Sequence, residues 1–489
     1  MIDKDNKMYV AYAEKPLYIN PKMINRHGLI AGATGTGKTV SLQVLAETFS
    51  NAGVPCFLAD MKGDLAGISQ PGSINKFIDA RIKEFGIDPS SLRFAGAPVR
   101  FFDVFGEQGH PMRTTISEMG PLLLARLMGL NKTQEGVLNI VFRIADEKQL
   151  LLIDIKDLRA MLDWASRNAK EYTSIYGNIS GTSIGAIQRA LLSLESQGAD
   201  KFFGEPAFNV FDLIQTEGGK GVLNILAADK LMMAPKLYST FLLWLLSELY
   251  DQLPEAGDLP LPKFVFFFDE AHMLFEDATG ALQEKVELVV RLIRSKGVGV
   301  YFISQSPADI PVEVLGQLGN RIQHALRAFT PQDQKVVRAA SQTFRTNPAF
   351  DTEQAILELG TGEALVSFLD EKGAPSVVER AKMLFPMSQI GAITIQQRDT
   401  LIKQSRLFGM YERNFDRESA YERITDERLT EQKRAEEELD REYRRDASIQ
   451  RRGSSKSVFD KALGSAATSI GRSVGTQIVR GILGAIFKR

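Results

Sequence analysis

The sequence predicts an α/β protein in which a mostly parallel sheet is flanked by helices. Two observations carry this prediction. The glycine-rich loop "GATGTGKT" (32–39) follows a short apolar strand pattern and precedes the helical pattern "KTVSLQVLAETFSNAG". The apolar run "KFVFFFDEAHMLF" (263–275) is typical of a strand that is buried on both faces, as strands of parallel sheets are. A large helical insertion and a charged helical C-terminal tail complete the predicted organisation.

Composition excludes several classes of protein. The 489 residues are 44% apolar, enough for a buried core, so global disorder is excluded. The 59 basic and 60 acidic residues nearly cancel, so the whole-chain charge argues neither for nor against nucleic acid. The single cysteine, Cys56, allows no intramolecular disulfide, and the polar start "MIDKDNKMYV" lacks a signal-peptide pattern. "YSTFLLWLLSELY" (238–250) is too short to span a bilayer, so we expect a soluble, cytoplasmic protein.

The first part of the predicted core covers residues 1–109. It begins with two short strands, "MYVAYAE" and "PLYI", which lead into the loop. The helix after the loop ends at Gly53, a plausible C-cap. The strand "VPCFLADMKGD" and the strand "VRFFDVFG" (99–106) follow. Strand, loop, helix and strand in this order predict the start of a parallel sheet.

Helical periodicity with few strand signals predicts an insertion subdomain at 110–205. The core resumes at 206–390 with the strand "GKGVLNILAA" and a long apolar helix that ends near residue 252. After the Phe-rich strand come the charged helix "QEKVELVVRLIRSKG" and the strand "VGVYFISQSP" (298–307). The segment "EALVSFLDEKGAPSVVERAKMLF" predicts a hairpin that turns at Lys372–Gly373.

The composition shifts beyond residue 390. Residues 391–450 are dense in both charge signs, with i,i+4 pairs such as Glu437–Arg441 and Asp440–Arg444, which predicts a solvent-exposed or coiled helix. Residues 451–489 begin with the linker "RRGSSKS" and continue as a Gly-rich, faintly amphipathic tail. That tail is either a helix docked on its own protein or one that contacts a membrane or a partner.

The loop satisfies the pattern G-x-x-x-x-G-K-[ST] between a strand and a helix, which predicts a site for ATP. Its glycines leave room for backbone N–H groups to surround an anion, and the helix that begins near Lys38 adds its positive dipole end. We expect the Lys38 ammonium to reach the β- and γ-phosphates and the Thr39 hydroxyl to bind Mg²⁺. The predicted nucleotide-binding residues are Gly32, Ala33, Thr34, Gly35, Thr36, Gly37, Lys38, Thr39 and Val40.

Polar residues at the ends of the later strands are expected to complete this site. Asp269 supplies the second magnesium contact, through water, and Glu270 is the candidate general base that polarises the attacking water. This pair favours hydrolysis over transfer to an acceptor, and the alternative is an acidic pair that caps a helix. Gln305 either senses the γ-phosphate or caps the turn before Pro307. Arg294 either reaches the phosphates of a neighbouring copy or is a solvated helix charge.

Two further sets of polar residues are candidates for a site. Asp60, Lys62 and Asp64 follow the second core strand at the edge where ligands bind in open α/β sheets, and their alternative is ordinary loop charge. The four histidines show no metal-ligand spacing, so no zinc site is expected. We interpret His272, in "DEAH", as a structural histidine rather than a catalyst.

Four segments together resemble the HerA–FtsK superfamily of ring-forming P-loop ATPases, and within it a HerA-like, YjgR-type bacterial branch. They are "GATGTGKT", "FFFDEAH", "RSKGVGVYFISQSPADIP" and "LGTGEALVSF". The resemblance runs from about residue 15 to 390. It implies a RecA-like P-loop NTPase core, ATP hydrolysis at subunit interfaces, and hexameric rings that translocate DNA. HerA proteins also carry an N-terminal β-barrel, for which the residues before Gly32 leave no room.

The resemblance implies the same residue roles as the chemistry above. Lys38 and Thr39 match the family's phosphate and magnesium contacts, Asp269 and Glu270 match its magnesium-binding and catalytic acids, and Gln305 matches its sensor. Arg294 falls where the family's trans-acting arginine lies. Arg321 or Arg327 is the corresponding second phosphate sensor.

The leading functional expectation is a DNA translocase or helicase-like motor that uses ATP and Mg²⁺ and contacts DNA through its phosphates. An alternative is an ATPase that acts on protein or at the membrane, as related secretion ATPases do. A tandem-core DEAH helicase would need a second RecA-like domain, for which the tail is too charged. A regulatory protein that binds ATP with little turnover is the remaining alternative.

Overall fold

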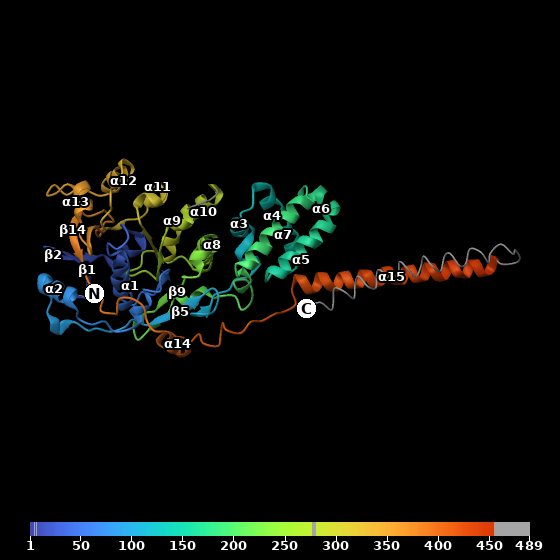
Figure 1. Ribbon diagram of the computed structural model, residues 1–489, viewed down its shortest axis with the longest axis horizontal. Helices are drawn as coiled ribbons and strands as arrows, with labels where there is room; N and C mark the ends of the chain where they lie inside the picture. Colours follow the sequence, from blue (N-terminus) through green and yellow to red (C-terminus); the bar gives the residue numbers. More distant parts are fainter. Residues whose placement is uncertain (4, 6, 276–279, 454–489) are drawn as a thin grey trace. The chain divides into compact units, whose positions relative to one another are not determined.

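A computed structural model describes residues 1–3, 5, 7–275 and 280–453 (Figure 1). The internal contacts divide the chain into two units, Met1–Ile424 and Thr425–Arg489. The first unit thus extends past residue 390, where the sequence predicts the end of the core. None of the helices in the described ranges is long and apolar enough to cross a membrane.

One sheet of twelve strands forms the centre of the first unit. Its order is β2-β1-β14-β13-β12-β3-β11-β10-β4-β9-β5-β6. The strands are β1 (Met8–Ala13), β2 (Lys15–Ile19), β3 (Gly28–Ala31), β4 (Cys56–Asp60), β5 (Val99–Asp103), β6 (His110–Pro111), β9 (Leu223–Ala227), β10 (Phe264–Phe268), β11 (Val298–Ser304), β12 (Asn320–Gln323), β13 (Glu363–Ser367) and β14 (Glu379–Met383). A separate small pair is β7 (Thr216–Glu217) and β8 (Lys220–Gly221).

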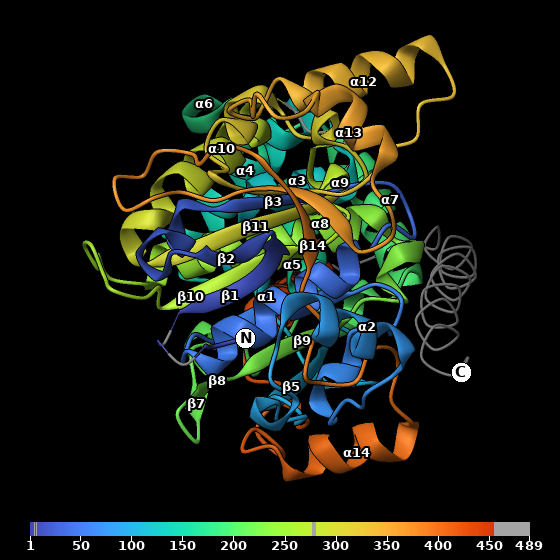
Figure 2. The same cartoon turned by 90° about the vertical axis from the view of Figure 1, so that its left-hand side faces the viewer.

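The sheet has a parallel part and an antiparallel edge. The strands from β12 to β6 run parallel, whereas β13, β14, β1 and β2 pair antiparallel. Figure 2 shows β3, β11 and β10 next to one another in the parallel part. The hairpin predicted near Lys372–Gly373 is confirmed as the β13–β14 connection, which turns between Asp370 and Ala374.

Helices cover both faces of the parallel strands. They are α1 (Lys38–Asn51), α2 (Lys76–Phe85), α8 (Pro235–Gln252), α9 (His272–Phe275), α10 (Gly280–Ile293), α11 (Val312–Leu315), α12 (Pro331–Ser341), α13 (Thr352–Glu358) and α14 (Ile395–Gln404). Side chains alternate between two cores along β10. Phe264, Phe266 and Phe268 join the core that includes α8 and α10, whereas Val265 and Phe267 join the core that includes α1. The fully apolar sequence of β10 follows from burial on both faces.

Five helices form the region predicted as a helical insertion. They are α3 (Ile116–Met128), α4 (Lys132–Glu147), α5 (Ile155–Arg167), α6 (Ala169–Tyr176) and α7 (Gly181–Ser196). Capping boxes start α3 at Thr115, α4 at Asn131 and α5 at Asp154. Figure 1 shows these helices gathered beside α8, and their apolar faces share its core. The insertion thus packs directly on the face of the sheet that α8 covers.

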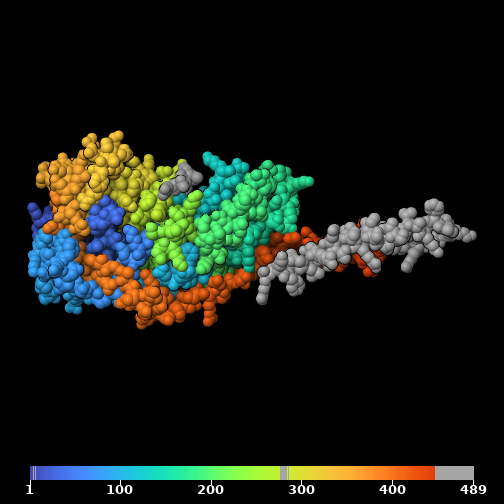
Figure 3. All heavy atoms as spheres, in the orientation of Figure 1, coloured from blue at the N-terminus to red at the C-terminus, as the bar shows by residue number. Residues whose placement is uncertain are grey.

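Part of the segment predicted as a charged helix packs on the first unit instead. Arg398 of α14 lies over the Phe101 ring, 4.6 Å from its centroid, and Tyr411 is buried. Figure 3 shows this stretch in orange along one face of the first unit. The charged helix itself is α15 (Ala420–Gly453), so the first residues of the predicted linker are helical. Within the second unit, Asp440 and Arg444 form the expected ion pair at 2.9 Å.

Candidate functional site

Residues 32–39, named here the phosphate loop, join β3 to α1. Gly32 N donates to Ser304 O at 3.2 Å, and Ala33 N donates to Ala325 O at 2.8 Å. Ser304 ends β11 and Ala325 follows β12, the two strands on either side of β3. These hydrogen bonds hold the loop at the carboxyl edge of the parallel strands, where ligands bind in open α/β sheets.

A glycine with left-handed backbone geometry starts α1. Gly37 has φ +114°, and a Cβ added there would lie 3.2 Å from the Gly362 amide nitrogen. No side chain caps the helix, which begins at Lys38 as predicted. The N–H groups of the first turn and the positive end of the helix dipole are therefore available to an anion in the loop.

The Lys38 side chain folds back over the phosphate loop. Its Nζ donates to Gly32 O at 2.5 Å and to Ala33 O at 3.1 Å. Burial lowers the pKa of Lys38, whereas the negative charges of Glu270 and Asp269 act in the opposite direction. The ammonium group therefore lies close enough to both carboxyl groups to interact with them electrostatically.

The acidic pair follows β10 at the same edge of the sheet. Only β11 separates β10 from β3, and the three strands run parallel. Burial, followed by the charge of Glu270, raises the pKa of Asp269 to about 7. Glu270 N donates to Asp269 Oδ1 at 2.9 Å, and Tyr238 OH donates to Asp269 O at 2.8 Å. Both the backbone and α8 thus fix the position of Asp269.

Glu270 has an unusual conformation. Its φ of +48° lies in the left-handed region, which costs a non-glycine residue on the order of 1–3 kcal/mol. Among the described residues its buried Oε2 has no hydrogen-bond partner, and His272 Nδ1 lies 3.5 Å from this atom. A strained residue with an unsatisfied carboxylate oxygen is typical of a functional site. His272 itself is only half-buried and lies beside this carboxylate, a position that its interpretation as a structural histidine did not anticipate.

The helical insertion contacts the acidic segment through one arginine. Arg126 Nη2, from α3, donates to Met273 O at 3.3 Å and to Leu274 O at 3.2 Å. The same nitrogen donates to Ser239 Oγ of α8 at 3.1 Å. Since α9 directly follows Glu270, the Arg126 guanidinium links the insertion to the candidate catalytic residues.

The remaining predicted residues of this edge differ in exposure. Thr39 and Val40 are half-buried in the first turn of α1, and Gln305 is exposed directly after β11. Asp60 is buried at the end of β4, where its carboxylate accepts from Asp64 N at 3.1 Å and from Leu65 N at 3.2 Å. Asp60 therefore stabilises its own loop. The positive charge of Lys62, from that loop, acts on the Asp269 carboxyl group.

Two contacts that the sequence did not predict connect late residues to the phosphate loop. Gly362 N donates to Thr36 O at 2.9 Å. His324 forms hydrogen bonds of 2.8 Å with Ser41 Oγ and with Glu363 O. Burial lowers the pKa of His324 to about 4, so the ring is neutral, with Nδ1–H donating to the carbonyl and Nε2 accepting from the hydroxyl.

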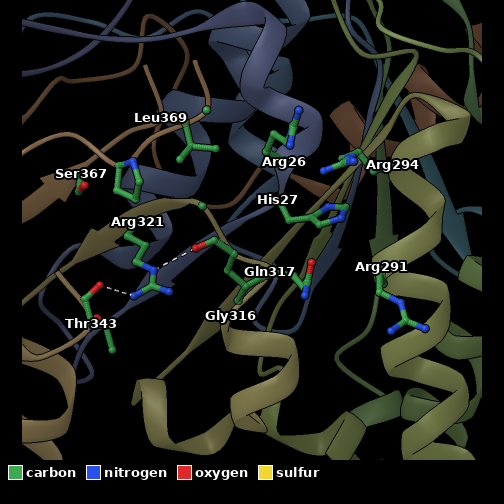
Figure 4. Close-up of a pocket in the computed structure, with 14 residues that line it drawn as sticks. Arg26, His27, Arg291, Arg294, Gly316, Gln317, Arg321, Thr343, Ser367 and Leu369 are labelled. Carbon is green, nitrogen blue, oxygen red and sulfur yellow. Dashed lines mark hydrogen bonds between the residues drawn. The ribbon is translucent and has the colours of Figure 1, made fainter. Parts of the chain in front are cut away.

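Arg294 lies at the opposite edge of the sheet. It precedes β11, just as Arg26 precedes β3, so both lie at the amino ends of parallel strands. Figure 4 shows them with Arg291 and Arg321 around a cavity of about 270 Å³ that no acidic residue lines. The Arg294 side chain is exposed, and within the described part of the chain no hydrogen bond or ion pair joins the guanidinium groups of Arg26, Arg291 or Arg294 to another residue.

The Arg321 guanidinium forms hydrogen bonds within its own chain. It donates to the carbonyl oxygens of Leu318 at 2.9 Å and Thr343 at 2.6 Å (Figure 4). It also donates to Leu315 O at 3.0 Å. It lies at the edge away from the phosphate loop of its own chain. Arg327, exposed after β12 on the loop side, is left as the candidate sensor.

Comparisons with known proteins place this geometry in a family. A family model described as "Helicase HerA-like C-terminal" matches residues 5–489. The DNA double-strand break repair helicase HerA of Sulfolobus acidocaldarius is 32% identical over 99 residues, 20% of this chain and 19% of that protein. A probable helicase of Methanocaldococcus jannaschii is 30% identical over 125 residues, 25% of this chain and 22% of that protein. The matched segments thus span about a fifth of the lengths of these curated relatives.

A solved structure supports the fold independently. The bacterial conjugative coupling protein TrwB has a TM-score of 0.50 and 16% identity, over 77% of this chain and 89% of that one. At this identity the similarity is one of fold, and with the sheet described above it confirms the predicted α/β, RecA-like core. Since the family model covers almost the entire sequence, the chain belongs to the HerA-like helicase family.

Proposed function

We propose that the protein hydrolyses ATP in the presence of Mg²⁺ and works as a ring-forming motor on DNA. The observation that carries the proposal is that the phosphate loop with Lys38 and the acidic pair Asp269–Glu270 lie at the same edge of the sheet, where their charges act on one another. A cation for phosphate, a metal ligand and a general base are the groups that nucleotide hydrolysis requires. Membership in the HerA-like family supports the same activity.

The residues at the phosphate loop fit a magnesium nucleotide. The uncapped first turn of α1 and the left-handed Gly37 provide N–H groups for phosphate oxygens. The Thr39 hydroxyl and the Asp269 carboxylate are oxygen ligands of the kind that Mg²⁺ prefers. Mg²⁺ bound by these residues would neutralise negative charge on the phosphates. Lys38 adds a second positive charge at the same place.

Glu270 is the proposed general base. Its Oε2, which is buried without a hydrogen-bond partner among the described residues, takes a proton from the attacking water. The water oxygen forms a bond to the γ-phosphorus, the bond from that phosphorus to the bridging oxygen breaks, and ADP leaves. Gln305, at the end of the strand between the loop and the acidic pair, orients the water or senses the γ-phosphate.

Arg294 completes the site in a ring. Within one chain it lies at the edge opposite the phosphate loop, so only the nucleotide of a neighbouring copy is within its reach. An arginine that reaches a neighbour's γ-phosphate stabilises the charge of the transition state. We therefore propose that the active particle is a closed ring, with a hexamer as the expected size.

DNA is the polymer along which we propose that the motor moves. Both curated relatives are helicases by name, and one of them acts in DNA double-strand break repair. Because the formal net charge of this chain is −1, contacts to DNA phosphates would come from local basic groups rather than from the overall charge.

The test compares the ATPase rate of assembled particles with and without double- or single-stranded DNA, for the wild type and Glu270→Gln. We expect DNA to raise the wild-type rate. The substitution should lower kcat by about 100-fold or more, because the base is lost, while ATP binding persists. Equal rates for the two proteins would contradict the role of Glu270.

An ATPase rate that does not respond to DNA would contradict the proposal that the motor moves on DNA. The proposal that the protein hydrolyses ATP would still stand. Lipid or protein stimulation that disappears on removal of residues 456–489 would then favour the alternative expectation of an ATPase at the membrane or on protein. That predicted C-terminal tail lies outside the described residues.

A further inference from the structure

A half-exposed aromatic ring beside the phosphate loop has no role in the proposed hydrolysis. Phe77, near the start of α2, is 46% exposed. A Cβ added to Gly362 would lie 3.4 Å from Phe77 Cζ, so the ring lies beside the position that a side chain of Gly362 would take. Gly362 in turn contacts Thr36 through a hydrogen bond, and a Cβ on Gly37 would lie 3.3 Å from the Gly362 Cα. A single glycine therefore separates this ring from the phosphate loop.

A buried arginine holds the ring in place. The Arg81 guanidinium carbon lies 5.0 Å from the centroid of the Phe77 ring and 5.4 Å from that of Phe85. Its Nη2 also donates to Gly362 O at 3.4 Å. Arg81 is only 6% exposed, so its side chain is fixed by packing. Phe77 is thus a rigid aromatic surface that remains partly open to solvent.

The strand order places this surface where the base of a nucleotide would lie. The γ-phosphate end of the proposed site is defined by Lys38, Asp269 and Glu270. The acidic pair follows β10, so this end lies on the side of β3 that faces β11 and β10. Gly362 directly precedes β13, on the other side of β3. A nucleotide whose terminal phosphate faces the acidic pair extends across the loop in the direction of Gly362.

We propose that Phe77 is the stacking platform for the nucleobase, with Gly362 kept free of a side chain so that the base can approach. This inference rests on the proposed nucleotide site. Stacking on an aromatic ring accepts every base, because each base has a π-face. The platform therefore raises affinity for nucleotides over inorganic polyphosphates and discriminates little between adenine and guanine.

The test measures the affinity of the full-length protein for ADP and for inorganic pyrophosphate, each with Mg²⁺, by calorimetry. Phe77→Ala should weaken ADP binding about 5- to 150-fold, the range measured for loss of a base–aromatic stack, and leave pyrophosphate binding unchanged. Phe77→Trp should keep ADP affinity near the wild-type value. The matched control is Phe211→Ala, since Phe211 is 43% exposed on the helical turn Val210–Leu213, and it should change neither affinity.

The binding measurements distinguish a wrong assignment of Phe77 from a wrong assignment of the nucleotide site. If the wild type binds neither ADP nor pyrophosphate, the proposed function fails and this inference fails with it. If the wild type binds both and Phe77→Ala keeps its ADP affinity, the platform is wrong and the nucleotide site stands. An equal loss for ADP and pyrophosphate also overturns the platform, because the substitution would then have disturbed the phosphate loop.

Discussion

At the scale of single residues, two buried histidines couple the fold to pH. His27 Nδ1 accepts from Val300 N at 3.0 Å, and His324 links α1 to Glu363. Burial lowers the pKa of each from 6.5 to about 4. Between these values the unfolded chain binds protons that the folded protein does not. The unfolding free energy is therefore unaffected by these groups above pH 6.5 and falls as the pH is lowered toward 4.

The expected loss is about 2 kcal/mol per histidine at pH 5. It can be measured as a lower urea midpoint at pH 5 than at pH 7. His324→Gln removes one titrating group, so this variant should show a weaker dependence of the midpoint on pH. If wild type and variant lose the same amount, the His324 ring is not the neutral, buried group described above.

At the scale of secondary structure elements, the Arg126 contact predicts a role for the insertion. Arg126→Ala removes the hydrogen bonds from α3 to the carbonyls of Met273 and Leu274, which follow Glu270, the proposed general base. We expect kcat for ATP to fall about 5- to 100-fold, because a catalytic group displaced by a fraction of an ångström loses much of its effect. The KM for ATP should change by less than about two-fold, since the phosphate loop is untouched.

The control for this prediction is Arg143→Ala on α4. Arg143 is an exposed arginine of the same insertion, and its partner is Glu147 at 2.8 Å in an i,i+4 pair. Such pairs contribute little to stability, so kcat should stay at the wild-type value. A rise in KM with unchanged kcat for Arg126→Ala would show that α3 positions the nucleotide rather than Glu270.

Local patterns in the sequence were sufficient for most elements and for part of the site. The loop motif predicted the places of Lys38 and Thr39 because the motif itself occupies eight consecutive residues, and the apolar run before Asp269 indicated a buried strand end. The order of the strands cannot be read from such patterns. Gly362 and His324 contact the phosphate loop only because β12 and β13 lie beyond β3 in the sheet. Their roles could therefore not be predicted.

At the scale of the whole molecule, the residues of the proposed catalytic site lie on opposite edges of one sheet. The phosphate loop with its acidic pair lies at the carboxyl ends of the parallel strands, and Arg294 lies at the amino ends. Copies arranged head to tail would bring the two halves together, and such an interface closes into a ring when its rotation permits. Residues 391–424 belong to the first unit although the sequence predicted the core to end at 390, because their contacts are with residues distant in the sequence.

The measurement that tests the account most directly is ATPase complementation between two defective variants. Glu270→Gln and Arg294→Ala should each be nearly inactive alone. In a random one-to-one mixture, about a quarter of the interfaces pair an intact Glu270 with an intact Arg294, so about a quarter of the wild-type rate should return. No recovery on mixing, or full activity of Arg294→Ala by itself, would contradict a site shared between neighbouring copies.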